Sequence, residues 1–75
     1  RIARRLLHLA DKLATANGRI PVSQADLADF AGATRESVAR VLAVWREQGW
    51  VELSRGAIRI TNEQALDALA AAEDE

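Results

Sequence analysis

The stretch that decides the fold is Ser23-Gln24-Ala25-Asp26-Leu27-Ala28-Asp29-Phe30-Ala31-Gly32-Ala33-Thr34-Arg35-Glu36-Ser37-Val38-Ala39-Arg40-Val41-Leu42. Ser23 and Thr34 are residue types that cap helix N-termini, and Asp26 completes a weak capping box with Ser23. Gly32 is typical of a helix end. The pattern predicts two helices, over 24–31 and about 34–48, joined by a short turn. Two helices connected in this way form a helix-turn-helix.

The second predicted helix has two unlike sides when its residues are placed about 100° apart. One side gathers apolar residues, namely Val38, Val41, Leu42 and Trp45. The opposite side gathers mostly polar and small ones, namely Glu36, Ala39, Arg40, Ala43 and Glu47, and Arg35 and Ser37 flank this side near the start of the helix. The apolar side, Trp45 included, is expected to pack in the core.

The polar side of this helix has the chemistry of DNA base reading. Arginine can donate two hydrogen bonds to guanine O6 and N7, and glutamate can accept one from the cytosine amino group. Arg35, Glu36 and Arg40 lie in the N-terminal half, which recognition helices use to reach bases. Thr34 and Ser37 suit phosphate oxygens at the helix start. The plainer interpretation is that Glu36 and Arg40, four residues apart, form a surface ion pair.

The residues before this stretch predict a helix and a short strand. Apolar residues at helical spacing over 2–16 form one stripe, made of Ile2, Leu6, Leu9 and Leu13. Asn17-Gly18 ends this helix, and Arg19 to Val22 can form a strand that Pro21 would place at a sheet edge. In the helix over 24–31, Leu27 and Phe30 are expected to be buried.

The residues after it predict a hairpin and a last helix. Gly49 suits the end of the recognition helix, and two alternating segments, 50–53 and 57–60, surround Ser54-Arg55-Gly56. The inward residues of this wing should be Val51, Leu53, Ile58 and Ile60. Thr61 and Gln64 predict a capping box that opens a helix burying Leu66 and Leu69. The acidic end, Glu73-Asp74-Glu75, is unfavourable at a helix C-terminus and is expected to fray.

The expected fold class is therefore mainly α with a small β-hairpin, a winged helix-turn-helix. We assign residues 1–61 to this domain, with its recognition helix at about 34–48 and its wing at about 50–60. Residues 62–75 form the C-terminal helix and acidic tail. Although the net charge is −1, residues 1–60 carry +4 and the last 15 residues carry −5. A modestly basic body is compatible with nucleic-acid binding.

Composition excludes several other functions. The 75 residues contain no cysteine and a single histidine, His8, so metal and acid–base sites lack partners and His8 is taken as structural. No nucleophile with a base and no phosphate-binding glycine loop is present, and we predict no enzyme activity and no cofactor in this fragment. No apolar run approaches the roughly 20 residues that span a bilayer, and a reducing, cytoplasmic location is expected.

The helix-turn-helix stretch resembles that of the cyclic-AMP receptor protein / Fnr family of bacterial transcription regulators. The resemblance rests on Leu27-Ala28, on Gly32 four positions later, and on Thr34-Arg35-Glu36-Ser37-Val38-Ala39-Arg40. Gly49-Trp50-Val51 and the short wing fit as well, so it covers about residues 1–60. It implies an upstream sensory and dimerising region that is missing here and a homodimer formed through that region. RNA polymerase is a further partner to expect. The effector is not encoded in these residues.

The resemblance also implies a half-site. In the cyclic-AMP receptor branch, an Arg-Glu-x-x-x-Arg run reads a TGTGA-like sequence, and Arg35, Glu36 and Arg40 match that run. Ala39 stands where the Fnr branch has serine, which argues against Fnr-like reading. Phosphate contacts carry over to Thr34 and Ser37, and to Ser23 and Gln24, where relatives often have a basic residue.

Two interpretations remain open at this stage. The first is sequence-specific binding of double-stranded DNA, with Arg55 at the wing tip contacting a phosphate and Arg59 either doing so or facing solvent. The second is a winged helix that binds another protein and never meets DNA. Arg1, Arg4 and Arg5 are expected to form a solvated face, and Trp50 either packs or faces the missing region.

Overall fold

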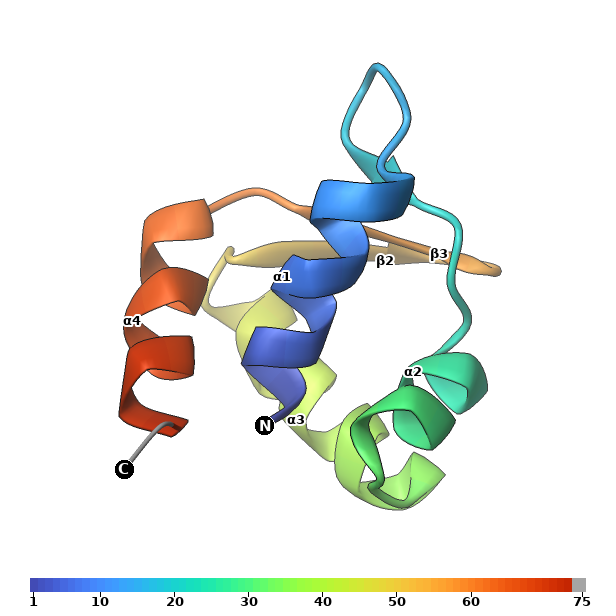
Figure 1. The fold of residues 1–75 in the computed structure, drawn as a ribbon, viewed down its shortest axis with the longest axis vertical. Coiled ribbons are helices and arrows are strands. Elements are labelled where there is room, and N and C mark those ends of the chain that lie inside the picture. Colours follow the sequence, from blue (N-terminus) through green and yellow to red (C-terminus); the bar gives the residue numbers. More distant parts are fainter. Residues whose placement is uncertain (74–75) are drawn as a thin grey trace.

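The computed structural model describes residues 1–73, and over this range the chain forms four helices and three short strands (Figure 1). They follow in the order α1 (Ile2–Leu13), β1 (Arg19–Ile20), α2 (Gln24–Ala31), α3 (Arg35–Glu47), β2 (Val51–Ser54), β3 (Ala57–Ile60) and α4 (Glu63–Glu73). The fold is a winged helix-turn-helix, mainly α with a small β-sheet, and this confirms the predicted fold class.

The sheet has three antiparallel strands in the order β1-β3-β2, so β1 lies at an edge. Ile20 is opposite Ile58 and Ile58 is opposite Leu53, while Arg19, Arg59 and Glu52 pair in the same way one residue away. Because successive side chains of a strand point to opposite faces, the apolar row faces the core and the charged row faces out. The predicted hairpin therefore gains a third strand, which begins at Arg19.

The core is aliphatic and draws on every helix and strand. The fully buried larger side chains are Leu6, Ile20, Leu27, Val38, Leu42, Val51, Ile58 and Leu66, and Trp45 is 6% exposed beside them. Among the described residues no polar or charged side chain is buried. The polar groups of this domain therefore lie at its surface, where a ligand can reach them.

Two expectations about α1 and α2 were wrong. Helix α1 ends at Leu13 and not near residue 16, and the Leu13 side chain in its last turn is 47% exposed. Phe30 was expected in the core but is 41% exposed. Helix α2 buries Leu27, Ala28 and Ala31, and Phe30 falls off that stripe. Its ring stacks with His8, centroids 6.0 Å apart, and lies under the Arg5 guanidinium at 5.2 Å.

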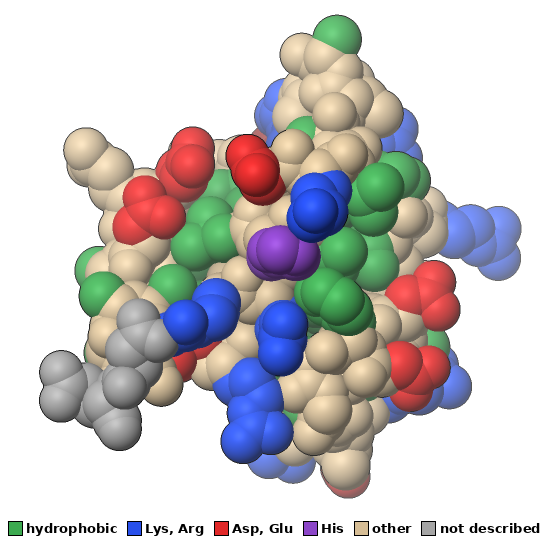
Figure 2. Space-filling model, in the orientation of Figure 1, with side chains coloured by type: hydrophobic (Ala, Val, Ile, Leu, Met, Phe, Trp, Pro, Cys, Tyr) green, Lys and Arg blue, Asp and Glu red, His purple; other side chains and the backbone are tan. Residues whose placement is uncertain are grey.

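Figure 2 shows this face of the molecule, with the single histidine among basic and hydrophobic side chains. His8 is thus exposed, and it contacts an aromatic ring as a surface residue. Within residues 1–73, no group of His, Asp and Glu side chains is arranged to hold a metal ion.

The start of α4 also differs from the prediction. The side chain of Asn62, one residue later than expected, accepts a hydrogen bond from the Ala65 N–H at 3.1 Å. Thr61 instead donates its hydroxyl to the Gly49 carbonyl at 2.7 Å, which ties the end of the wing to the end of α3. Thr61 and Asn62 are both good cap residues, and the tertiary contact of Thr61 decides between them.

Helix α4 packs along α1, and its last described residue contacts the start of α1. The Glu73 carboxylate accepts hydrogen bonds from the backbone N–H groups of Ala3 at 3.0 Å and Arg4 at 3.1 Å, and it forms an ion pair with the Arg1 amino group. These N–H groups have no partner within α1, because the first turn of a helix leaves its donors unsatisfied. Glu73 therefore caps α1 from a distance. The other two acids of the expected frayed end, Asp74 and Glu75, lie outside the described residues.

The contact changes the acidity of Glu73. Burial alone would raise its pKa, but hydrogen bonds from the Arg1 amino group and from the backbone of Arg4 and Ala3, together with the charge of that amino group, hold the pKa below its ordinary value of 4.5. A carboxyl whose pKa is lower in the folded state stabilises the fold above its unfolded pKa. That stabilisation is lost as the pH falls through the lowered value.

We expect Glu73→Gln to lower the free energy of unfolding by about 1 kcal/mol at pH 7, because it weakens the cap and removes its charge. In acid, once the pH is below the lowered pKa of Glu73, the variant and the wild type should differ much less, since the carboxyl is then protonated. Urea unfolding at the two pH values measures this. Asp67→Asn, which changes an exposed acid of the same helix, is the matched control. If acidification lowers the free energy of unfolding equally in the wild type and in Glu73→Gln, Glu73 does not cap α1.

Candidate nucleic-acid interface

The turn between α2 and α3 depends on Gly32. This residue has φ 68°, in the left-handed region that L side chains rarely adopt. With Gly32 so placed, its N–H donates to the Asp29 carbonyl at 3.3 Å, and the Ala33 N–H donates to the Ala28 carbonyl at 2.9 Å. These two hydrogen bonds end helix α2, and α3 begins as few as three residues after Gly32.

Both helices of this pair begin with the predicted caps. The Ser23 hydroxyl accepts a hydrogen bond from the Asp26 N–H at 3.0 Å. The Thr34 hydroxyl accepts one from the Ser37 N–H at 3.0 Å, and its own proton is directed to the Ser37 hydroxyl at 3.0 Å. The Ser37 hydroxyl therefore keeps its proton for an outside acceptor at the start of α3.

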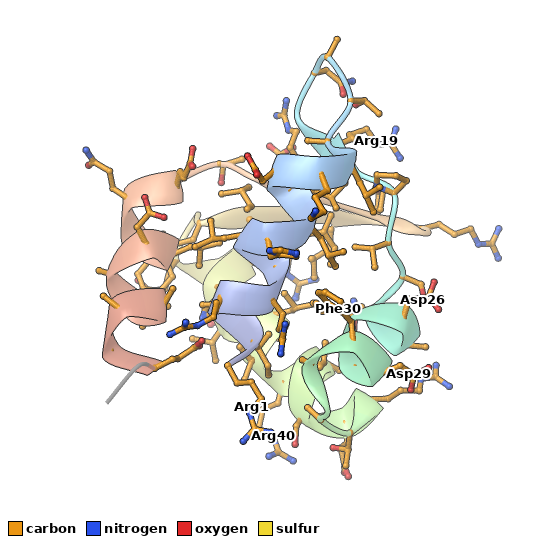
Figure 3. All side chains as sticks on the ribbon, in the orientation of Figure 1. Arg1, Arg19, Asp26, Asp29, Phe30 and Arg40 are labelled. Atoms are coloured by element: carbon orange, nitrogen blue, oxygen red, sulfur yellow. The ribbon has the colours of Figure 1, made fainter. Side chains whose placement is uncertain are left out.

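Helix α3 turns its apolar side inward and its polar side to solvent. Val38 and Leu42 are fully buried and Trp45 nearly so, whereas Arg35, Glu36, Ala39 and Arg40 are exposed. Among residues 1–73, no salt bridge joins Glu36 to Arg40, although their spacing permits one. The candidate base-reading side chains are thus brought together on one open surface and are not occupied by one another. Figure 3 shows Arg40 at the lower end of the view.

The wing places one of the candidate arginines at its tip. Gly56, at φ 69°, closes the turn between β2 and β3, and the exposed Arg55 precedes it. Arg59, the other arginine of the wing, is paired. Its Nε lies 3.1 Å and its Nη2 2.9 Å from Oε1 of Glu52 on the neighbouring strand. The structure therefore distinguishes two arginines that the sequence left nearly equivalent.

The other sequence candidates lie on α2, at its first turn. Gln24 opens the helix directly after the Ser23 cap, and both are partly exposed. The candidate residues thus come from three places: the start of α2, the outer side of α3, and the wing tip. One exposed arginine beside the wing, Arg19, was not a sequence candidate. Its only signal was the predicted edge strand that contains it.

This arrangement defines the class: a winged helix-turn-helix domain with an open polar recognition helix. The profile of the Crp-like helix-turn-helix domain matches residues 1–69, and the chain belongs to that family. It is a DNA-binding domain of the kind that transcription regulators carry.

Individual relatives agree with this membership. A CRP-like cAMP-activated global transcriptional regulator of Mycobacterium tuberculosis is 32% identical, over 88% of this chain and 32% of the relative. A CRP/FNR-family transcriptional regulator of Thermus thermophilus superposes with a TM-score of 0.88 at 27% identity, over 95% of this chain and 39% of that structure. The catabolite activator protein of Thermus thermophilus gives 0.83 at 30% identity, over 95% and 32%.

The chain thus spans about a third of the length of these relatives. They are transcription regulators and not enzymes, in agreement with the sequence prediction. In the part of the chain that the structure describes, none of the helices has the length and apolar character of a membrane span.

The conformation of Gly32 leads to a prediction about the turn. A Cβ at this position would meet only the Arg1 side chain, at 3.7 Å, so the cost of a substitution lies in the backbone. Gly32→Ala should destabilise the domain by about 1–2 kcal/mol, and Gly32→Asn by less, since asparagine tolerates this conformation better. Urea unfolding gives the order. An alanine variant as stable as the wild type would show that the turn does not need a left-handed residue.

Proposed function

We propose that this domain reads one half-site of a DNA operator, with α3 lying in the major groove. The observation that carries the proposal is the open side of α3, where Arg35, Glu36 and Arg40 are exposed and unpaired while the opposite side is buried. A recognition helix needs this division, because base edges can be reached only by side chains that the core does not use.

Each side chain has a proposed role. Arg35 and Arg40 donate to guanine O6 and N7, and Glu36 accepts from a cytosine amino group. Ala39, exposed between them, lets the helix approach the groove closely. The order of the bases, a TGTGA-like half-site, follows from the resemblance of the Arg-Glu-x-x-x-Arg run to the cyclic-AMP receptor branch.

The phosphate contacts are proposed for the surrounding residues, namely Ser23, Gln24, Thr34, Ser37 and Arg55. The hydrogen bond from Thr34 to Ser37 supports different roles for these two residues at the start of α3. Thr34 caps the helix and orients Ser37, and Ser37 donates to the phosphate. Arg55 adds a charge at the wing tip. Contacts of this kind position the protein without selecting a sequence.

The remainder of the proposal concerns the longer protein. We propose that the regulator acts in the cytoplasm as a homodimer through its upstream region and contacts RNA polymerase at the promoter. In such a dimer the two recognition helices address half-sites one helical turn apart, about 34–36 Å. The relatives are longer than this chain, which covers about a third of their length.

Selection from random duplexes tests the proposal, using the chain joined to a dimerising helix. We expect paired half-sites that contain G·C pairs and resemble TGTGA, about one helical turn apart. Enrichment of a different G·C-containing half-site would leave DNA reading in place and overturn the TGTGA assignment. If no sequence were enriched, the domain would be a protein-binding winged helix instead.

Substitution of a single arginine provides a second test. Arg40→Ala should weaken binding to the selected site by about 1–3 kcal/mol and reduce binding to unrelated DNA far less. Arg46→Ala is the matched control, because Arg46 is also exposed on α3 but lies in its last turn, away from the N-terminal half. Fluorescence anisotropy titrations on both duplexes measure the two losses. Equal losses on all sequences for Arg40→Ala would exclude base reading by this residue.

A further inference from the structure

Arg19 is an exposed cation whose charge is not neutralised within the domain. It lies on β1, at the edge of the sheet, and is directly opposite Arg59 of β3. Like charges in this position repel each other. The structure relieves the repulsion at one of the two residues only, since Glu52 pairs with Arg59. In residues 1–73, Arg19 forms no salt bridge with a carboxylate.

The wing holds the Arg19 side chain in place. Its Nη2 donates to the Ser54 hydroxyl at 3.2 Å, across the intervening strand β3. Ser54 is itself fixed, because its hydroxyl donates to the Ala57 carbonyl at 3.4 Å. One donor of the guanidinium is used by this contact, and arginine has five. The remaining donors are presented next to the wing turn that carries Arg55.

The position of Arg19 links two proposed phosphate contacts. The chain continues from Arg19 through Pro21 to the start of α2, where Ser23 and Gln24 lie, and a single hollow is lined by Arg19, Pro21 and Gly56 among others. Arg19 therefore lies beside the wing tip and is followed closely by the first turn of α2. Figure 3 shows Arg19 in the upper part of the view and Arg40 at the lower end.

We propose that Arg19 binds a DNA phosphate outside the half-site, on the duplex flanking the bases read by α3. This inference rests on the proposed function. The longest dimension of the domain is 32 Å, close to the roughly 34 Å of one DNA turn. With this dimension lying along the duplex, a contact made on the side away from Arg40 falls beyond the base pairs that Arg40 reaches.

The net charge of the proposed DNA-contacting surface also supports a role for Arg19. The three arginines proposed to contact DNA are accompanied on α2 and on the N-terminal half of α3 by three exposed acids, and these six residues are Arg35, Arg40, Arg55, Asp26, Asp29 and Glu36. Their net charge is zero. Binding to the DNA phosphate backbone depends on positive charge that is not neutralised within the protein. Arg19 supplies such a charge, which the six residues together lack.

The salt dependence of DNA binding tests this inference. Replacing one phosphate-contacting arginine should make the slope of log K against log salt shallower by about 0.9. For Arg19→Gln, the loss of affinity should thus be about 3.5 times larger at 50 mM than at 200 mM salt. Arg19→Lys keeps the charge and should retain the slope. The double variant Glu52→Gln/Arg59→Gln removes the neutral pair and should leave the slope unchanged, and thermal unfolding verifies that each variant is folded.

Duplex length is the second arm of the experiment. The Arg19→Gln difference should be present on a duplex with a flanking turn on each side of the half-site and absent on one that ends at the half-site. An unchanged slope for Arg19→Gln on the longer duplex, while the wild type binds it, would overturn the inference. Absence of wild-type binding would overturn the proposed function as well, and a difference on both duplexes would place the contact inside the half-site.

Discussion

The rest of the structure depends on the burial of one side of α3. Val38, Leu42 and Trp45 pack among aliphatic side chains from α1, α2, α4 and the sheet. Burying each such side chain contributes on the order of 1.5–3 kcal/mol, a large amount for a chain of this length. Because no polar or charged side chain of residues 1–73 is buried, the fit of the apolar side chains determines how α3 is turned. The same packing that makes the domain stable therefore directs Arg35, Glu36 and Arg40 to solvent.

Three further contacts fix the other elements relative to α3 and to one another. The glycine turn at Gly32 brings α2 against α3, and the Thr61 hydroxyl joins the wing to the end of α3. Glu73 connects α4 to the first turn of α1. In each case a polar group satisfies backbone donors or acceptors that the helices leave unpaired. The three groups of candidate DNA contacts are thus held by packing and capping, and they do not depend on contacts with one another.

The local features could be predicted from the sequence because each has a short-range cause. The caps at Ser23 and Thr34, the left-handed Gly32 and the inward stripe of α3 all depend on residues within a few positions of each other.

The errors have long-range causes. Phe30 lies on the surface because α2 packs through Leu27, Ala28 and Ala31, and the choice of Asn62 over Thr61 depends on a carbonyl twelve residues from Thr61. The Glu73 cap joins residues about seventy positions apart, and local patterns contain no signal for it. The pairing of Arg59 with Glu52, which leaves the neighbouring Arg19 without a carboxylate partner, likewise becomes visible only with the strand register.

The open side of α3 has a consequence for how such a domain can change over time. No side-chain hydrogen bond, ion pair or ring contact joins Arg35, Glu36 or Arg40 to the rest of residues 1–73, so replacing them should alter the free energy of unfolding by no more than about 0.5 kcal/mol. Substitutions in the core are far more costly. A lineage could therefore exchange these three residues and acquire a new operator while keeping the same scaffold intact. Divergence of regulatory targets would then be limited by the genes that lose or gain control, and not by the stability of the protein.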